Sequence, residues 1–497
     1  MNQYDQFREI IKQAKAYEYA ITVVGWDSST EAPRGAFARR AEMMGELRKQ
    51  VLKLKTSSDY QHLVNYLLLH KDDLSSEELR EVRKAKKALD KTIKIPQNEI
   101  IEYGKLIQLS QKDWELAKAN EDWDGFKGTL AKIIDYNRKF IDYYGYDMEP
   151  YDVLLDDYEE GMTMKDFDEF FDTLRVELVP FVKEVLENKK VEEKPYINAK
   201  YKADKQKEFC TYLMDVFAFN QEKGGMKTSV HPFTWNTHPS DVRFTTRYLE
   251  NYVFSSIFAA IHELGHATYE QQIDEKFNDT LLSGGTSMGI HESQSRFYEN
   301  IIGRSKSFWE THLPKLQKVF PRQLKDVDVD SFYEAVNRAE ASFIRVEADE
   351  LTYPLHIMLR YEIEKMLFNN EIEVDDLPQI WNDKMEAYLG IRPKTYSEGV
   401  LQDVHWSAGL LGYFPTYALG SAYAAQLYYT MKNEIDLDNL ISTNNIKEIN
   451  TWLKDRIHKF GSSKSPKELL KEVTNEEFNP MYYVRFLKEK YTELYLK

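Results

Sequence analysis

The chain has 497 residues and a net charge of −16, and 30% of its residues are charged. An acidic chain of this kind does not suit nucleic acid, which selects proteins with a basic surface stripe. The single cysteine, Cys210, excludes an internal disulfide framework and is typical of a protein kept in a reducing compartment. The first residues lack the layout of a signal peptide, so we expect a cytoplasmic protein.

Helical periodicity dominates the chain from one end to the other. Apolar residues recur at helical spacing from Phe7 to Val24, and the turn-rich segment 26–35 predicts where this helix ends. Charge-rich helical patterns continue to about residue 145 and are typical of solvated helix faces. No repeat, low-complexity tract or linker interrupts them. We therefore expect an all-α, mainly helical domain over residues 1–497, whose two halves could flank a deep cleft.

Segment 227–248 is the exception to the helical pattern. Two runs rich in Val, Thr and aromatic residues, K-T-S-V-H-P-F-T-W and D-V-R-F-T-T-R-Y, are joined by the turn sequence T-H-P-S. Such runs are typical of short strands. The segment therefore predicts a very small two-stranded β-ribbon.

The next segment, 261–266, carries the metal-binding pattern I-H-E-L-G-H. His262 and His266 are four residues apart, so on a helix both imidazoles lie on one face and can share a metal ion. Glu263 is placed to act as a general base toward water at the metal. The upstream apolar run indicates a buried helix with Asn251 as a candidate N-cap, and the ribbon edge beside it could present an extended peptide. Two core histidines held by hydrogen bonds are the alternative.

A hydrolytic zinc site needs a third protein ligand. Glu270 continues the i, i+4 spacing, but it lies about 12 Å from His262 along the helix axis, too far for metal bonds of about 2 Å. The metzincin spacing would require glycine and histidine where the chain has Tyr269 and Gln272. Glu292 is the better candidate, because it follows a glycine turn and opens a second helical pattern that could pack back onto the metal face.

A stretch without charged residues, 407–431, is long enough to span a bilayer. It contains Pro415, several glycines, Gln426 and several aromatic residues. This composition favours a buried helix that lines a cavity over a helix that faces lipid. We therefore expect no membrane segment.

Further motifs follow one another along the chain. They are H-P-F from His231, D-x-R-x-T from Asp241, H-E-S-Q from His291, R-x-x-A-D from Arg345 and G-x-x-Q-D-x-H-W from Gly399, with the framing segments Y-D-V-L-L-D-D-Y-E-E-G-M-T from Tyr151 and G-Y-F-P-T-Y-A-L-G from Gly412. Together with H-E-x-x-H, these motifs identify a resemblance to the thermostable carboxypeptidase Taq family of zinc-dependent metallocarboxypeptidases. The resemblance covers nearly the whole chain. The chain departs from that family at Glu160, where proline is frequent, and at Ser28, where glutamine is common. Both positions lie outside the metal motifs.

The resemblance implies an all-helical fold with a cleft, related to angiotensin-converting enzyme and neurolysin, and a homodimer. It also implies a carboxypeptidase that removes single residues from the C-termini of short peptides, with broad specificity that excludes proline. Zn²⁺ would be the metal, and Co²⁺ or Mn²⁺ could occupy the same ligands. Two alternatives stay open: a dipeptidyl-carboxypeptidase or endo-oligopeptidase of the same fold, and a non-catalytic peptide-binding protein. Glu263 argues against the second, because a binding protein has no use for a general base.

The resemblance also assigns roles to residues of the site. Glu292 would be the third metal ligand, which agrees with the spacing argument. His405, Tyr413 and Tyr417 are candidates to stabilise the oxyanion of the tetrahedral intermediate, because related zinc peptidases place a histidine and then tyrosines downstream for this purpose. With 33 tyrosines in the chain, either tyrosine could instead be a core aromatic residue.

An exopeptidase must recognise a free C-terminal carboxylate, and arginine suits this task through charge-assisted hydrogen bonds. Arg345 is the first candidate and Arg243 the second. Either could instead be the structural partner of an aspartate, Asp349 or Asp241. His231 is placed with them on the substrate side, although we expect it, like His291, mainly to orient loops or to bond the metal ligands.

Overall fold

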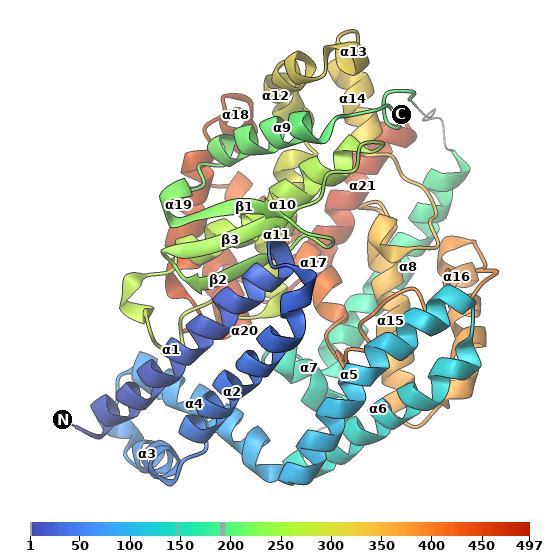
Figure 1. Cartoon of the computed structure of the whole chain (residues 1–497). Coiled ribbons are helices and arrows are strands. Elements are labelled where there is room, and N and C mark those ends of the chain that lie inside the picture. The colour runs from blue at the N-terminus through green and yellow to red at the C-terminus, as the bar shows by residue number, and fades with distance from the viewer. Residues whose placement is uncertain (1, 147–148, 189–193) are drawn as a thin grey trace.

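The computed structural model describes residues 2–146, 149–188 and 194–497, and helices make up most of it (Figure 1). The α-helices are α1 (Gln3–Thr30), α2 (Phe37–Lys55), α3 (Ser58–Leu69), α4 (Ser76–Lys94), α5 (Gln97–Asn120), α6 (Trp123–Tyr144), α7 (Asp152–Tyr158), α8 (Met164–Glu187), α9 (Ala203–Val216), α10 (Val253–Gln271), α11 (Met288–Arg296), α12 (Lys306–Val319), α13 (Pro321–Leu324), α14 (Val329–Val336), α15 (Tyr353–Phe368), α16 (Leu377–Leu389), α17 (Pro415–Lys432), α18 (Leu437–Ser442), α19 (Ile446–Arg456), α20 (Pro466–Thr474) and α21 (Met481–Tyr495). A π-helical segment, η5 (Phe297–Gly303), continues α11. The predicted mainly helical fold class is confirmed.

The described part of the chain contains a sheet of three strands, β1 (Gly224–Thr228), β2 (Thr234–His238) and β3 (Asp241–Thr246), in the order β1-β3-β2. The hairpin of β2 and β3 is antiparallel, as the turn signal predicted, whereas β1 adds to β3 in parallel. Sequence reasoning missed β1, because glycines at positions 224 and 225 weaken the strand signal. A Cβ at position 224 would lie 1.8 Å from the carbonyl oxygen of Val242, so close pairing with β3 requires glycine there.

Helix α1 packs beside α2 and against the sheet (Figure 1). It ends at Thr30, inside the turn-rich segment 26–35 that predicted its end. In its last turn the hydroxyl groups of Ser28, Ser29 and Thr30 donate to carbonyl oxygens four residues earlier, so these polar side chains are satisfied within the helix. A Cβ at Gly25 would lie 2.6 Å from the ring of Trp235, so this glycine lets α1 approach β2 closely.

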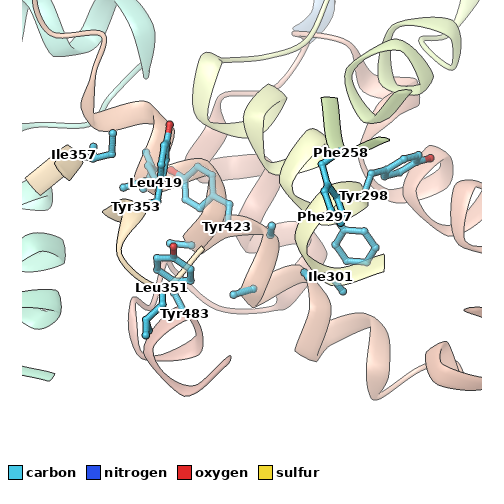
Figure 2. Packing of buried hydrophobic residues seen from close by; sticks show 14 of the residues in the cluster. Phe258, Phe297, Tyr298, Ile301, Leu351, Tyr353, Ile357, Leu419, Tyr423 and Tyr483 are labelled. Atoms are coloured by element: carbon cyan, nitrogen blue, oxygen red, sulfur yellow. The ribbon is translucent and has the colours of Figure 1, made fainter. Parts of the chain in front are cut away.

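Helix α17 runs through the largest hydrophobic core. Figure 2 shows part of this core, where side chains of α10, η5, α15, α17 and α21 gather. Most residues of α17 are buried, which is the environment that the charge-free stretch 407–431 predicted. None of the described helices combines the length and the apolar character that crossing a membrane requires.

Helix α10 lies against the sheet and holds the H-E-x-x-H sequence near its middle. The prediction that Asn251 caps this helix is wrong. The N-cap position is Tyr252, which makes no side-chain cap hydrogen bond, and Asn251 lies one residue outside it. Near the start of the helix, the hydroxyl oxygen of Ser256 lies 2.7 Å from Oε1 of Gln206 and 3.0 Å from the carbonyl oxygen of Val253, and its one proton can be donated to either.

Candidate metal centre and active site

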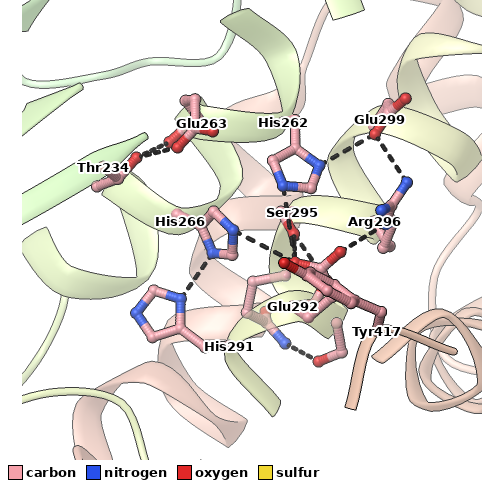
Figure 3. Close-up of polar contacts among 12 residues, drawn as sticks. Thr234, His262, Glu263, His266, His291, Glu292, Ser295, Arg296, Glu299 and Tyr417 are labelled. Carbon is pink, nitrogen blue, oxygen red and sulfur yellow. Dashed lines mark hydrogen bonds and ion pairs between the residues drawn. The ribbon is translucent and has the colours of Figure 1, made fainter. Parts of the chain in front are cut away.

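Helices α10 and α11 bring His262, His266 and Glu292 together (Figure 3). One ligand atom from each residue lies within 4.8 Å of the others. Oε2 of Glu292 is 3.7 Å from Nε2 of His262 and 3.5 Å from Nε2 of His266. The three residues expected to bind metal are therefore gathered in one cluster, although Glu292 comes from a different helix.

Small residues at two positions allow this approach. A Cβ at Gly265 would lie 2.5 Å from the carbonyl oxygen of Gln294, so the glycine inside H-E-L-G-H lets α10 cross α11 closely. On the other side of α11, a Cβ at Gly420 of α17 would lie 2.5 Å from the Cβ of Glu292. Glu292 is thus clasped between α10 and α17, which restricts its rotamers.

A network of buried charged side chains orients the carboxylate of Glu292 and the imidazole of His262. Arg296 donates through Nε to Oε1 of Glu292 at 2.7 Å, which leaves Oε2 facing the histidines. Nδ1 of His262 lies 3.0 Å from Glu299, a carboxylate that Arg304 also binds. If Nδ1 carries the proton in that bond, Nε2 keeps its lone pair for a metal.

Proton affinities in the cluster favour metal binding. Burial by itself raises the pKa of Glu292, but the charges of Arg296 and His262 hold that pKa far below its usual range. Burial lowers the pKa of His266 to about 3, so its imidazole is neutral at physiological pH. Metal ligands must be deprotonated, and these two groups meet that condition before any ion binds.

His266 is held by a separate chain of polar contacts. Nδ1 of His266 lies 2.6 Å from Nδ1 of His291, and Nε2 of His291 lies 2.7 Å from Glu270. The carboxylate of Glu270 also accepts from the backbone of Gly285 and from Asn236 of β2. Glu270, which spacing excluded as a ligand, therefore contacts the ligand set only through His291.

Together these residues form a donor set of two imidazoles and one carboxylate, and each of the three also contacts a further polar side chain. This set fits Zn²⁺, which favours three such ligands in catalytic sites. Sequence reasoning missed Glu299, Arg296 and Arg304 because partners of metal ligands have no short motif. Glu299, for example, lies 37 residues from the histidine that it bonds.

Glu263 lies on α10 next to His262, with its carboxylate turned toward β2 (Figure 3). The hydroxyl group of Thr234 donates to its Oε2 at 2.6 Å. The side chain is buried, and this burial raises the pKa of Glu263. A buried carboxylate of raised proton affinity, held in place beside a metal cluster, is suited to general-base chemistry. Thr234 was another residue that sequence reasoning did not single out.

The candidates for oxyanion stabilisation also meet. Nε2 of His405 lies 3.3 Å from the hydroxyl oxygen of Tyr417, and the rings of Tyr413 and Tyr417 are 5.1 Å apart. Tyr417 belongs to α17, the helix that packs on Glu292, and it is drawn beside that carboxylate in Figure 3. Burial lowers the pKa of His405 to about 3, so it is neutral and can donate from one ring nitrogen only.

Arg345 is already paired. Its Nη2 lies 2.9 Å from Asp403, its Nε also contacts that carboxylate, and its Nη1 donates to the hydroxyl oxygen of Tyr353 at 3.2 Å. The aspartate that the sequence suggested as its partner, Asp349, instead accepts backbone and hydroxyl hydrogen bonds before α15. The guanidinium carbon of Arg345 is 5.3 Å from the centre of the Tyr417 ring, so this arginine borders the tyrosine cluster.

Arg243 and His231 lie elsewhere along the sheet region. Arg243 binds Asp241 on the same strand, with Nε at 2.6 Å, and lies 5.9 Å from the ring of Trp26. This pairing is the structural alternative considered for it. His231 is exposed in the loop before β2, where its carbonyl oxygen accepts from Ser229.

Comparison with known proteins agrees with this geometry. A model of the carboxypeptidase Taq (M32) metallopeptidase family matches residues 6–491. The chain belongs to this family. It is 43% identical over 492 residues to carboxypeptidase 1 of Bacillus subtilis (strain 168), covering 99% of this chain and 98% of that protein. It is 40% identical over 484 residues to thermostable carboxypeptidase 1 of Pyrococcus furiosus, covering 96% of each.

The fold agrees equally well. A solved structure of the Pyrococcus furiosus carboxypeptidase matches with a TM-score of 0.96 at 38% identity and covers 99% of both chains. The protein is therefore a metallocarboxypeptidase of the M32 family, and membership in this family implies a divalent metal ion.

Proposed function

We propose that this M32 enzyme uses zinc to remove single residues from the C-termini of short peptides, with broad specificity that excludes proline. The observation that carries the proposal is the cluster of His262, His266 and Glu292 within 4.8 Å, beside a buried Glu263. Co²⁺ and Mn²⁺ are the alternative metals for this donor set. A dipeptidyl-carboxypeptidase or endo-oligopeptidase register is the alternative activity, and the products distinguish it.

In the proposed mechanism, His262, His266 and Glu292 would hold the metal ion, which when bound would supply Lewis-acid chemistry and lower the pKa of water to about 7. Glu263, oriented by Thr234, accepts the proton of the attacking water and passes it to the leaving amine. His405, Tyr413 and Tyr417 provide donors for the oxyanion. The peptide bond breaks by direct attack of water, with no covalent intermediate on the protein.

The small sheet supports the peptide in this proposal. In the order β1-β3-β2, strand β2 is an edge strand, and Thr234 at its start bonds Glu263. An extended peptide paired along β2 would carry its scissile bond to the general base. Main-chain pairing of this kind is independent of side chains, which suits broad specificity.

Both candidate arginines pair with an aspartate, Arg345 with Asp403 and Arg243 with Asp241. Recognition of the terminal carboxylate is assigned to Arg345, because its guanidinium group borders Tyr417. We expect wild-type enzyme to trim free-acid peptides and to leave the same peptides with C-terminal amides intact. Arg345→Lys keeps a cation for Asp403 but loses the planar fork, so it should raise KM for free acids about 10- to 100-fold, the equivalent of a charged hydrogen bond. Steady-state kinetics on both peptide forms measures this.

Arg243→Lys is the matched control and should leave KM near the wild-type value. The assignment is wrong if Arg243→Lys raises KM while Arg345→Lys does not. Equal hydrolysis of acids and amides by wild-type enzyme would contradict an exopeptidase and favour the endo-oligopeptidase alternative.

The remaining features are also proposals. We infer one functional domain over residues 1–497, because β2 packs against both α1 and α10. A cytoplasmic location is supported by Cys210, which is buried and whose pKa burial raises to about 12, as suits an unreactive, reduced thiol. The homodimer rests on resemblance to the family.

A further inference from the structure

The framing segment Y-D-V-L-L-D-D-Y-E-E-G-M-T contains a buried carboxylate that the proposed chemistry does not use. Glu159, just after α7, is 0% exposed. Its Oε2 accepts from the backbone nitrogen of Gly289 at 2.8 Å, and its Oε1 accepts from the hydroxyl groups of Ser287 at 3.0 Å and Tyr423 at 3.3 Å. Burial raises the pKa of Glu159 to about 7.

These partners belong to α11, which carries Glu292, and to α17, which packs against Glu292. Ser287 is the N-cap of α11 and Gly289 lies in its first turn, three residues before Glu292. Tyr423 is on α17, one turn beyond Gly420, whose missing Cβ makes room for Glu292. The carboxylate of Glu159 thus joins the start of α11 to α17 through hydrogen bonds, in addition to the Ser287 cap.

The glycine in that first turn fits this contact closely. A Cβ at Gly289 would lie 2.6 Å from Oε2 of Glu159, so any side chain there would push the carboxylate off the helix end. Backbone freedom does not explain this glycine, because Gly289 has no positive φ angle. Contact with Glu159 does explain it.

We propose that Glu159 is a positioning residue for the metal centre, which sets the first turn of α11 against α17 and so fixes Oε2 of Glu292 toward the two histidines. The proposal rests on the proposed role of Glu292 as a metal ligand. It requires hydrogen bonding by Glu159, not its charge, because the residue contacts the start of α11 through the N–H of Gly289 and the hydroxyl group of Ser287, and α17 through the hydroxyl group of Tyr423. Each hydroxyl group can donate or accept.

The test compares four variants by zinc affinity, from chelator competition, and by the absorption spectrum of the Co²⁺-loaded protein. Glu159→Ala and Gly289→Ala should each weaken zinc affinity about 10- to 100-fold and alter the Co²⁺ spectrum. Glu159→Gln retains an acceptor for Gly289 and should restore both toward wild type. Glu160→Ala is the matched control, because the neighbouring carboxylate pairs with Arg80 at 2.6 Å, and it should change neither.

Circular dichroism shows which variants are folded. If Glu159→Ala does not fold, Gly289→Ala tests the same contact. The proposal is overturned if Gly289→Ala or folded Glu159→Ala binds zinc with wild-type affinity and spectrum, or if Glu159→Gln is as impaired as Glu159→Ala. Glu292→Gln separates the two levels of inference. If Glu292→Gln binds zinc with wild-type affinity, Glu292 is not a metal ligand. If Glu292→Gln loses zinc affinity while Glu159→Ala keeps it, Glu292 is a ligand but Glu159 does not position it.

Discussion

Glu263→Gln is expected to lower kcat/KM for peptides by roughly 10²- to 10⁴-fold and to leave the metal content unchanged. Glu263 lies outside the cluster of His262, His266 and Glu292, so its loss removes no ligand. The glutamine carbonyl can still accept from Thr234, which preserves the local geometry. What disappears is the group that takes the proton of the attacking water.

Steady-state kinetics together with elemental analysis of the purified variant measures both parts of this prediction. Glu250→Gln, an exposed residue that pairs with Lys200 at 3.6 Å, is the matched control and should keep wild-type kinetics. Near-normal turnover by Glu263→Gln would disprove the assignment of the base. Loss of metal from the same variant would mean that Glu263 acts as a ligand.

Glu292→Gln is expected to weaken zinc affinity more than about 100-fold, beyond the loss typical of an outer-shell residue. The amide oxygen of glutamine binds a metal ion more weakly than Oε2 of the charged carboxylate does. The change also leaves the buried cation Arg296 without the partner that it binds at 2.7 Å. Activity should fall in parallel and return in part at high zinc concentration.

Competition with a chromophoric chelator gives the dissociation constants. Glu310→Gln on the exposed face of α12 is the control for the same chemical change at a surface site. Zinc affinity within a few-fold of wild type in Glu292→Gln would contradict the three-ligand site. In that case the metal would have to be held by the two histidines and a group outside the cluster.

Sequence periodicity predicted those parts of the fold and site that depend on local order. The i, i+4 spacing of His262 and His266 places both on one face of α10, and the pattern around Glu292 predicts the helix that brings it back. The turn sequence T-H-P-S likewise predicts the β2–β3 hairpin. Each of these patterns is local, because it extends over only one or two helical turns or one tight turn between strands.

The rest depends on contacts between distant segments, which no local pattern encodes. Arg345 pairs with Asp403 across 58 residues, where sequence motifs suggested Asp349. Glu159 reaches Gly289 across 130 residues. The parallel strand β1 was missed for the same reason, because Gly224 makes sense only once β3 lies against it.

Metal-dependent removal of single C-terminal residues is tested by mass spectrometry of a mixture of unblocked eight- to ten-residue peptides, incubated with the protein before and after chelation. We expect a ladder that loses one residue at a time from the C-terminus, stops before proline, disappears with chelator and returns with Zn²⁺ or Co²⁺. Loss of dipeptides or internal cleavage would contradict the single-residue register. Intact peptides with every metal tried would contradict the proposed activity of this site.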